Sequence, residues 1–160
     1  MINEQMLKDI TVLYVEDDNA IQQNTIVTLE LVNAKIIPAV DGMDGLEKFK
    51  ANEEKIDIIV TDLSMPNMDG LEMIEEIKKI NKDIPVLITT AHQDISYLKQ
   101  AIELGVTSYI IKPIDIRNII KSISKAIEPV NERKELLLKI KTLKEENESL
   151  KNQLEEKLSR

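Results

Sequence analysis

The chain has 160 residues, a net charge of −8, 42% hydrophobic residues and no cysteine, which excludes a disordered chain, disulfides, thiolate catalysis and cysteine-based zinc sites. Residues 1–129 hold 22 acidic and 13 basic residues, whereas residues 130–160 hold seven and eight, so direct binding to nucleic acid is not expected. No apolar stretch approaches the roughly 20 residues that span a bilayer, and no signal peptide is recognisable, so we expect a cytoplasmic protein without membrane contact.

Five short apolar runs alternate with five longer amphipathic segments along the first four fifths of the chain. The runs predict β-strands at residues 11–15, 35–39, 56–61, 85–89 and 108–111. The other segments predict helices at residues 19–31, 44–51, 70–80, 95–104 and 116–127. The third and fifth runs are almost continuously apolar, which is typical of parallel strands covered on both faces. Five successive βα units predict an α/β fold with one open parallel sheet and helices on both faces.

Local signals support several of these boundaries. Asp69 precedes a predicted helix that has an acidic residue, Glu72, at its third position, as an N-capping residue would. Asp115 is placed to cap the helix that begins at residue 116. Gly105 follows the fourth helix, where a glycine commonly ends a helix. These helices are therefore expected to begin and end close to the predicted residues.

The pattern changes after residue 128, and a separate coiled-coil helix is predicted over residues 129–160. Apolar residues there recur at alternating spacings of three and four. The seam consists of Leu136, Ile140, Leu143, Asn147, Leu150 and Leu154. Asn147 favours a parallel two-stranded coil in fixed register, so we expect a homodimer through residues 130–158. Pro129 separates this segment from the preceding helix, either by a kink or as a fresh start.

The charges beside the seam do not settle whether this helix dimerises. In a parallel dimer Glu146 faces Lys151 of the second copy, which is attractive. Lys139 facing Lys144 is repulsive. Leu137 and Leu138 lie off the seam and fit a single amphipathic helix that packs on its own domain or stays in solvent. A solitary helix therefore stays open beside the dimer.

Polar side chains follow four of the five predicted strands. Glu16 and Asp17 follow the first, Asp62 the third, Thr90 the fourth and Lys112 the fifth. The carboxyl ends of parallel strands meet at one edge, so we expect these side chains to converge there. Three carboxylates packed together need a cation, and an all-oxygen set suits Mg2+. A carboxylate nucleophile with a metal, an ammonium and a hydroxyl is the equipment of phosphoryl transfer.

Four segments resemble the motifs of response-regulator receiver domains of two-component signalling. They are Val-Leu-Tyr-Val-Glu-Asp-Asp (12–18), Ile-Val-Thr-Asp-Leu-Ser-Met-Pro-Asn-Met-Asp-Gly (59–70), Ile-Thr-Thr-Ala (88–91) and Tyr-Ile-Ile-Lys-Pro (109–113). The resemblance implies a receiver domain over residues 1–128, a flavodoxin-like doubly wound sheet of order 2-1-3-4-5, and a sensor histidine kinase as phosphodonor. It also implies that the domain catalyses only its own phosphorylation and dephosphorylation, so an enzyme in the ordinary sense is not expected.

The resemblance gives roles to the acidic residues. Asp62 matches the phosphoacceptor, and Asp17 matches the direct Mg2+ ligand. Glu16 matches the acid that holds a metal-bound water. The backbone carbonyl of Ser64 stands where the metal site is completed. Asp18 falls outside the metal pair of the family, so we expect it to cap the first helix.

Further matches concern the switch that phosphorylation operates. Thr90 matches the hydroxyl that follows the phosphoryl group. Lys112 matches the lysine that pairs with the phosphate, and its peptide bond to Pro113 is typically cis in the family. Tyr109 matches the aromatic residue whose rotamer is coupled to the threonine. The resemblance therefore implies a face of the fourth helix, fifth strand and fifth helix that changes shape.

Two further positions resemble sites that tune the lifetime of the phosphoryl group. Ser64 lies two residues after Asp62, and His92 lies two residues after Thr90. His92 is the only histidine of the chain. A solvated loop residue and a residue that overhangs the acyl phosphate are both consistent with its position.

Two other functions share part of this pattern of polar residues. A phosphatase of the haloacid dehalogenase type needs a second acid two residues after its nucleophile, and Ser64 occupies that position. A dimerisation module that no longer depends on phosphorylation would not need the complete set of polar residues at the strand ends. The output stays open, because the chain is either a fragment that lacks an output domain or uses the coil itself as output.

Overall fold

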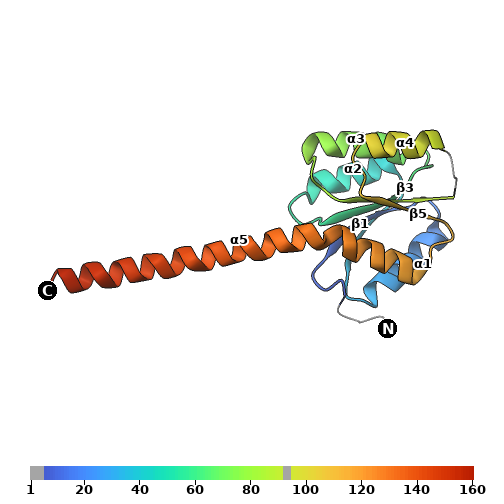
Figure 1. The fold of residues 1–160 in the computed structure, drawn as a ribbon. Coiled ribbons are helices and arrows are strands. Elements are labelled where there is room, and N and C mark those ends of the chain that lie inside the picture. The colour runs from blue at the N-terminus through green and yellow to red at the C-terminus, as the bar shows by residue number, and fades with distance from the viewer. Residues whose placement is uncertain (1–5, 92–94) are drawn as a thin grey trace. The chain divides into compact units, whose positions relative to one another are not determined.

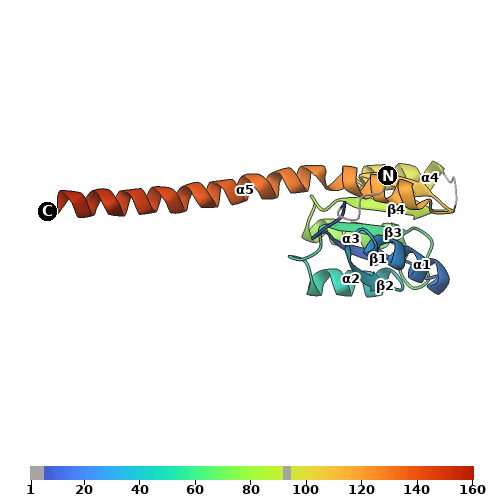
Figure 2. The same cartoon turned by 90° about the horizontal axis from the view of Figure 1, so that it is seen from below.

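The computed structural model describes residues 6–91 and 95–160 and divides the chain into two units, Met1–Ile127 and Glu128–Arg160. Five parallel strands form one sheet in the first unit. They are β1 (Thr11–Val15), β2 (Lys35–Ala39), β3 (Ile58–Asp62), β4 (Val86–Thr90) and β5 (Ser108–Ile111). Their order is β2-β1-β3-β4-β5, of which Figure 2 shows β4, β3, β1 and β2 in succession, and this confirms the predicted topology.

Helices follow the strands and cover both faces of the sheet (Figures 1 and 2). They are α1 (Asn19–Glu30), α2 (Gly42–Ala51), α3 (Gly70–Ile80), α4 (Ile95–Glu103) and α5 (Ile116–Leu158). Helix α1 and the first turns of α5 pack on one face, whereas α2, α3 and α4 pack on the other. The predicted α/β class is therefore confirmed.

Strand β1 shows how the sequence builds this core. Successive side chains of a strand point to opposite faces. Val12 and Tyr14 belong to the cluster under α1 and α5, while Leu13 and Val15 belong to the cluster under α2, α3 and α4. All four are fully buried, and a fully buried aliphatic side chain stabilises a fold by about 1.5–3 kcal/mol. The continuous apolar run thus holds both helical layers onto the sheet.

Aspartates cap four of the helices. The capping residues are Asp18, Asp41, Asp69 and Asp115. Each carboxylate accepts a hydrogen bond of 2.8–3.0 Å from a backbone N–H two or three residues later. Helix α2 was predicted to begin at Asp44, but it begins two residues earlier, at Gly42. The reason is that Asp41 caps it by accepting a hydrogen bond from the N–H of Asp44. Gly105 follows α4 with φ +80°, as predicted.

Strands β3 and β4 each end one residue later than predicted. Asp62 and Thr90 are the last residues of β3 and β4, not the first residues after them. The reason is that the ladder of backbone pairing extends this far, with Asp62 opposite Thr89 and Thr90 opposite Ile111. Both side chains therefore project from backbone that the sheet itself holds.

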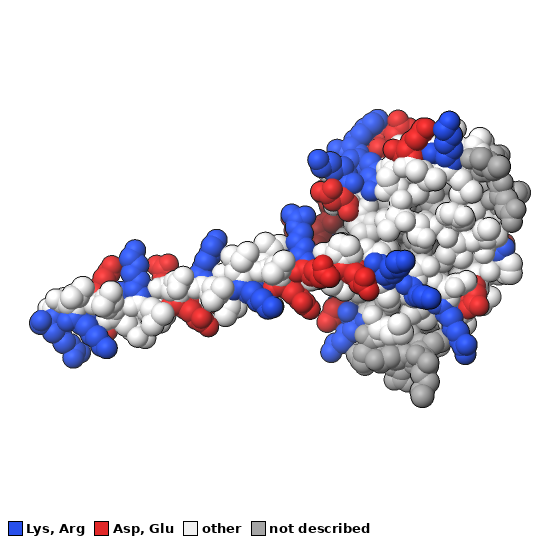
Figure 3. Space-filling view, in the orientation of Figure 1, with Lys and Arg blue, Asp and Glu red and all other residues white. Residues whose placement is uncertain are grey.

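The second unit is the C-terminal part of α5. Helix α5 includes Pro129, so the alternative that a new helix begins at this proline is wrong. A proline inside a helix removes one N–H donor, and here this loss does not end the helix. Basic and acidic side chains are interspersed along the unit (Figure 3). In the part of the chain that the structure describes, no helix has both the length and the apolar character to cross a membrane.

Candidate functional site

Three carboxylates meet at the carboxyl edge of the sheet. Glu16 directly follows β1, Asp17 comes next, and Asp62 ends β3; one oxygen of each lies within 4.8 Å of the others. Glu16 and Asp62 are 1% and 8% exposed, whereas Asp17 is exposed. Carboxylates this close repel one another, and a cation relieves that repulsion. An all-oxygen set that is open to water on one side fits Mg2+.

Lys112 follows β5 and reaches into this cluster. Its Nζ donates to Oε2 of Glu16 at 2.7 Å and to Oδ2 of Asp62 at 3.0 Å. Its backbone N–H donates to the carbonyl of Thr90 at 2.8 Å, which fixes the position of the lysine against β4. The peptide bond between Lys112 and Pro113 is cis. The ammonium therefore neutralises part of the charge of both buried carboxylates.

Burial and hydrogen bonding act in opposite directions on these groups. Burial raises the pKa of Glu16, and hydrogen bonds from Lys112 and from the backbone N–H of Asp18 offset only part of that effect. Burial also disfavours the charged form of Lys112, but its hydrogen bonds to Glu16 and Asp62 outweigh burial and raise its pKa. Burial raises the pKa of Tyr14 in β1 to about 12. At neutral pH the lysine is therefore a cation and the tyrosine a neutral phenol.

The two residues of the predicted switch lie on neighbouring strands. Thr90 at the end of β4 is 3% exposed, while Tyr109 in β5 is 48% exposed. The threonine thus belongs to the buried edge with Asp62, and the tyrosine ring is half open to solvent. Ser64 is exposed in the loop after β3, and His92 lies outside the described residues.

The loop after β3 folds back over the strand that it leaves. The backbone N–H of Leu63 donates to Oδ1 of Asp62 at 2.7 Å, and that of Gly70 donates to the carbonyl of Leu63 at 2.8 Å. A Cβ at Gly70 would lie 2.2 Å from the carbonyl oxygen of Asp62, so a glycine is required for this approach. The two oxygens of Asp62 thus have different donors, a backbone N–H for one and Lys112 for the other.

The same loop is tied to the loop between β2 and α2. Asn67, with φ +66°, donates through its side-chain amide to Oδ2 of Asp41 at 2.8 Å. The N–H of Gly42 donates to the carbonyl of Met68 at 3.1 Å, and a Cβ at Gly42 would lie 2.4 Å from that oxygen. Asparagine tolerates the left-handed conformation, so the asparagine at position 67 was the only hint in the sequence of this contact between the two loops. The contacts hold in place the loop that carries Ser64.

Gln22 in α1 is a second feature that the sequence did not indicate. Its side chain is 5% exposed, and its amide nitrogen donates to the carbonyls of Glu16 and Ala39. The sequence could show only that a polar residue lies on the side of α1 that faces the sheet. It could not show that the Gln22 amide binds the carbonyls of Glu16 and Ala39.

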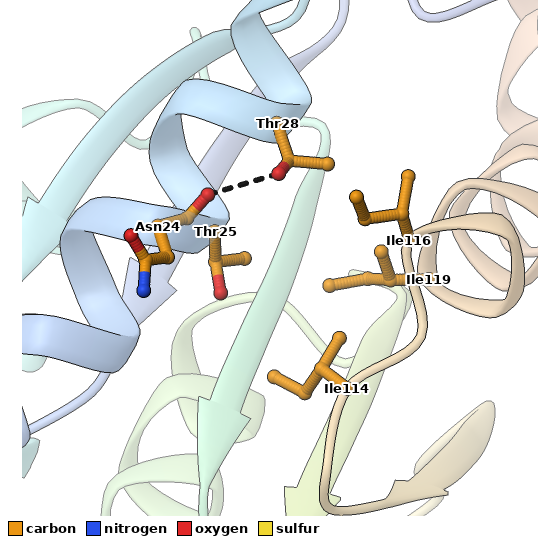
Figure 4. A pocket seen from close by; sticks show the side chains of 6 residues that line it. All are labelled: Asn24, Thr25, Thr28, Ile114, Ile116 and Ile119. Atoms are coloured by element: carbon orange, nitrogen blue, oxygen red, sulfur yellow. Dashed lines mark hydrogen bonds between the residues drawn. The ribbon is translucent and has the colours of Figure 1, made fainter.

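A shallow groove lies between α1 and the start of α5 (Figure 4). The lining residues are Asn24, Thr25, Thr28, Ile114, Ile116 and Ile119. None of them is charged, and Figure 4 shows the isoleucines facing the threonines across the groove. Ile114 directly follows Pro113, so the groove begins close to Lys112. The groove therefore starts two residues after Lys112 along the chain and has an uncharged, partly apolar lining.

Comparisons with known proteins agree with this geometry. Residues 12–124 match the family model of the response regulator receiver domain. The chain is 37% identical over 89 residues to the chemotaxis protein CheY of Treponema pallidum, covering 56% of this chain and 62% of that protein. It is similar to the crystal structure of a response regulator receiver domain protein of Clostridium thermocellum, with a TM-score of 0.72, 32% identity and coverage of 80% and 98%.

A chain of the CheX-CheY-BeF3-Mg+2 complex of Borrelia burgdorferi is also similar, with a TM-score of 0.69, 26% identity and coverage of 72% and 87%. The chain spans 62% of the Treponema protein and 27–52% of the transcriptional regulators among its curated relatives. The segment matched by the family model holds all of the sheet except Thr11, and every residue of the three-carboxylate cluster. The chain therefore belongs to the family of response regulator receiver domains, which are signalling domains of two-component systems.

Proposed function

We propose that Asp62 accepts a phosphoryl group from a phosphohistidine of a sensor histidine kinase, with Mg2+ as cofactor, in a cytoplasmic protein. The observation that supports this most directly is the contact of Lys112 with both Glu16 and Asp62 inside the three-carboxylate cluster. An ammonium and a cation site that share one nucleophilic carboxylate are the groups that stabilise a transferred phosphoryl group.

The proposed transfer uses this chain's own groups as follows. An oxygen of Asp62 attacks phosphorus, so that an O–P bond forms while the P–N bond of the donor breaks and the released imidazole takes up a proton. Lys112 donates its N–H groups to the phosphoryl oxygens. Glu16, Asp17 and Asp62, with the carbonyl of Ser64, would hold Mg2+, which supplies charge neutralisation when bound. Hydrolysis of the acyl phosphate, with no turnover of a separate substrate, ends the signal.

The signal itself is proposed to be a change of surface. An acyl phosphate carries about 1.5–2 negative charges at neutral pH in place of the single charge of the Asp62 carboxylate, and its oxygens would draw the Thr90 hydroxyl and Lys112 toward Asp62. Tyr109, now half exposed, would turn inward behind the threonine. Exposed apolar side chains of α4, β5 and the start of α5 include Tyr97, Ile102, Tyr109, Ile111 and Ile116. Their rearrangement would change the face of α4, β5 and α5, with Ser64 and His92 tuning the lifetime of the state.

The second unit is proposed to form a parallel coiled coil with a second copy of the chain. The apolar seam residues Leu136, Ile140, Leu143, Leu150 and Leu154 are 47–61% exposed. Five large apolar side chains at coiled-coil spacing, with Asn147 among them, are what a two-stranded parallel coil buries. The coil would carry the signal of the receiver to an output domain or to a partner.

Mass spectrometry of the intact protein tests the phosphoacceptor. Incubation with acetyl phosphate and Mg2+ is expected to add one phosphoryl group, and EDTA or the Asp62→Ala variant is expected to prevent this. Asp83→Ala, which removes an exposed aspartate outside the cluster, serves as the matched control and should be labelled like the wild type. Labelling of Asp62→Ala at the wild-type level would reject Asp62 as the acceptor.

A further inference from the structure

Gln22 connects the acidic residues to two strand ends. Its amide nitrogen donates to the carbonyl of Glu16 at 3.2 Å and to the carbonyl of Ala39 at 2.8 Å. The backbone N–H of Glu16 donates to the same Ala39 carbonyl at 3.1 Å. One buried side chain therefore joins the first turns of α1 to the carboxyl ends of β1 and β2.

This connection matters most for Asp17. The Glu16 carboxylate is held by the backbone N–H of Asp18 at 3.1 Å and by Lys112 at 2.7 Å. By contrast, within residues 6–91 and 95–160 no side chain or N–H group donates a hydrogen bond to the exposed carboxylate of Asp17. The position of that carboxylate is consequently set by its backbone, and Gln22 holds the carbonyl immediately before it.

We propose that Gln22 is a positioning residue for the metal site, because its amide fixes the backbone from which Asp17 projects toward Glu16 and Asp62. The inference rests on the proposed Mg2+-dependent function, and it adds a residue that touches neither the metal nor the phosphoryl group. Groups that orient metal ligands commonly change metal affinity by 10–100-fold when they are removed. A purely structural role, in which the amide only satisfies two buried carbonyls, makes a different prediction.

The test uses Gln22→Met in the full chain, because methionine keeps the length and volume of glutamine and removes the N–H donors. Gln23→Met is the matched control, since Gln23 is the exposed neighbour on the same helix. Calorimetric titration with Mg2+ alone, without a phosphodonor, is expected to give a Kd about tenfold above the wild-type value for Gln22→Met. The Kd of Gln23→Met should stay within about twofold of wild type, as expected for an exposed side chain.

Thermal melting distinguishes positioning from a structural role. A metal that binds only the folded state stabilises it by RT ln(1 + [Mg2+]/Kd), so a weaker affinity gives a smaller rise in Tm at the same Mg2+ concentration. We expect Gln22→Met to show a smaller rise in Tm at a fixed Mg2+ concentration than the wild type. A lower Tm in EDTA combined with an unchanged Mg2+ increment and an unchanged Kd would overturn the proposal.

Circular dichroism shows first whether each variant folds. If Gln22→Met does not fold, Gln22→Asn replaces it, because a side chain one methylene shorter cannot reach both carbonyls and is expected to weaken Mg2+ binding in the same direction. Failure of the wild type to bind Mg2+ and to be labelled at Asp62 would remove the proposed function. Wild-type binding with unchanged affinity in the Gln22 variants would remove this inference alone.

Discussion

The ammonium of Lys112 lies 2.7 Å from Oε2 of Glu16, although 96 positions separate the two residues. Strands β1 and β5, which these residues follow, are not neighbours, because β3 and β4 lie between them. The contact therefore spans the carboxyl edge of the sheet across the strands that end in Asp62 and Thr90. The charge of one lysine therefore compensates carboxylates that follow or end two other strands, β1 and β3.

Removal of this lysine is expected to destabilise the metal-free protein. In EDTA, Lys112→Met should lower the free energy of unfolding by about 3 kcal/mol, because breaking a buried pair leaves uncompensated carboxylates. Mg2+ should reduce the loss, since a cation bound to the folded state replaces part of the missing charge. Urea denaturation with and without Mg2+ measures both values.

The control for that experiment is Lys121→Met, which removes an exposed lysine of α5. It should change the free energy of unfolding by less than about 0.5 kcal/mol and show no dependence on Mg2+ beyond that of the wild type. Equal losses for Lys112→Met in EDTA and in Mg2+ would mean that the metal and the lysine do not act on the same carboxylates.

Glu16 predicts a pH dependence opposite to that of an ordinary salt-bridged carboxylate. Its folded-state pKa is raised above the unfolded value of about 4.3. The stability from its protonated form is therefore complete below about pH 4.3 and is lost as pH rises through the folded pKa. Glu16→Gln is never charged and keeps this contribution. In EDTA, the unfolding free energy of Glu16→Gln relative to wild type should thus rise with pH over this window and then level off.

Denaturant titrations at a series of pH values from 4 to 7 measure this difference. A difference that falls as pH rises would mean that the ion pair with Lys112 outweighs burial of the Glu16 carboxylate. In the presence of Mg2+ the sign should reverse at neutral pH, because the wild-type carboxylate then stabilises the bound cation while glutamine does not.

Gly70 and Gly105 predict different consequences of the same substitution. Gly70→Ala should destabilise by about 3 kcal/mol and slow phosphorylation by acetyl phosphate at least tenfold, because the new Cβ would displace the backbone of Asp62. Gly105→Ala meets no atom within 4 Å but has φ +80°, so about 1–2 kcal/mol of backbone strain is expected. Its phosphorylation rate, from intact mass over time, should equal that of the wild type. Equal rates for both variants would refute the role given to the close approach.

Much of the site could be predicted because of a property of parallel sheets. Residues at the carboxyl ends of such strands share one edge whatever the lengths of the connections between them. Hence Glu16, Asp62, Thr90 and Lys112 could be placed together from the order of the strands alone. The same rule does not say whether a residue is the last of its strand or the first of the following loop, and Asp62 and Thr90 proved to be the last residues of their strands.

The remaining contacts depend on distances that only packing determines. Gln22 reaches Ala39, 17 positions away, and Asn67 reaches Asp41, 26 positions away. Nothing in the spacing of these polar residues distinguishes them from polar residues that make no such contact. Gly70 belonged to a recognised motif, but the reason for a glycine is the approach of the Asp62 carbonyl, which no local pattern contains.

The proposed coiled coil predicts that aspartate substitutions of two exposed leucines have unequal effects on dimerisation. Leu143 lies in the seam and is 57% exposed, while Leu138 lies off the seam and is 66% exposed. An aspartate at the seam would place two unpaired charges in the dimer interface, so Leu143→Asp should weaken dimerisation at least 100-fold. Leu138→Asp changes charge and hydrophobicity by the same amount outside the interface, and the dimer should persist.

Analytical ultracentrifugation over a range of concentrations measures both dimer constants, and labelling of Asp62 in the same samples shows that the receiver stays intact. A monomeric wild type would favour the single amphipathic helix. Equal dissociation of both variants would place the leucines in a less specific apolar contact, because a parallel two-stranded coil buries position 143 and leaves position 138 in solvent. Selective loss with Leu143→Asp is the result that the heptad register requires.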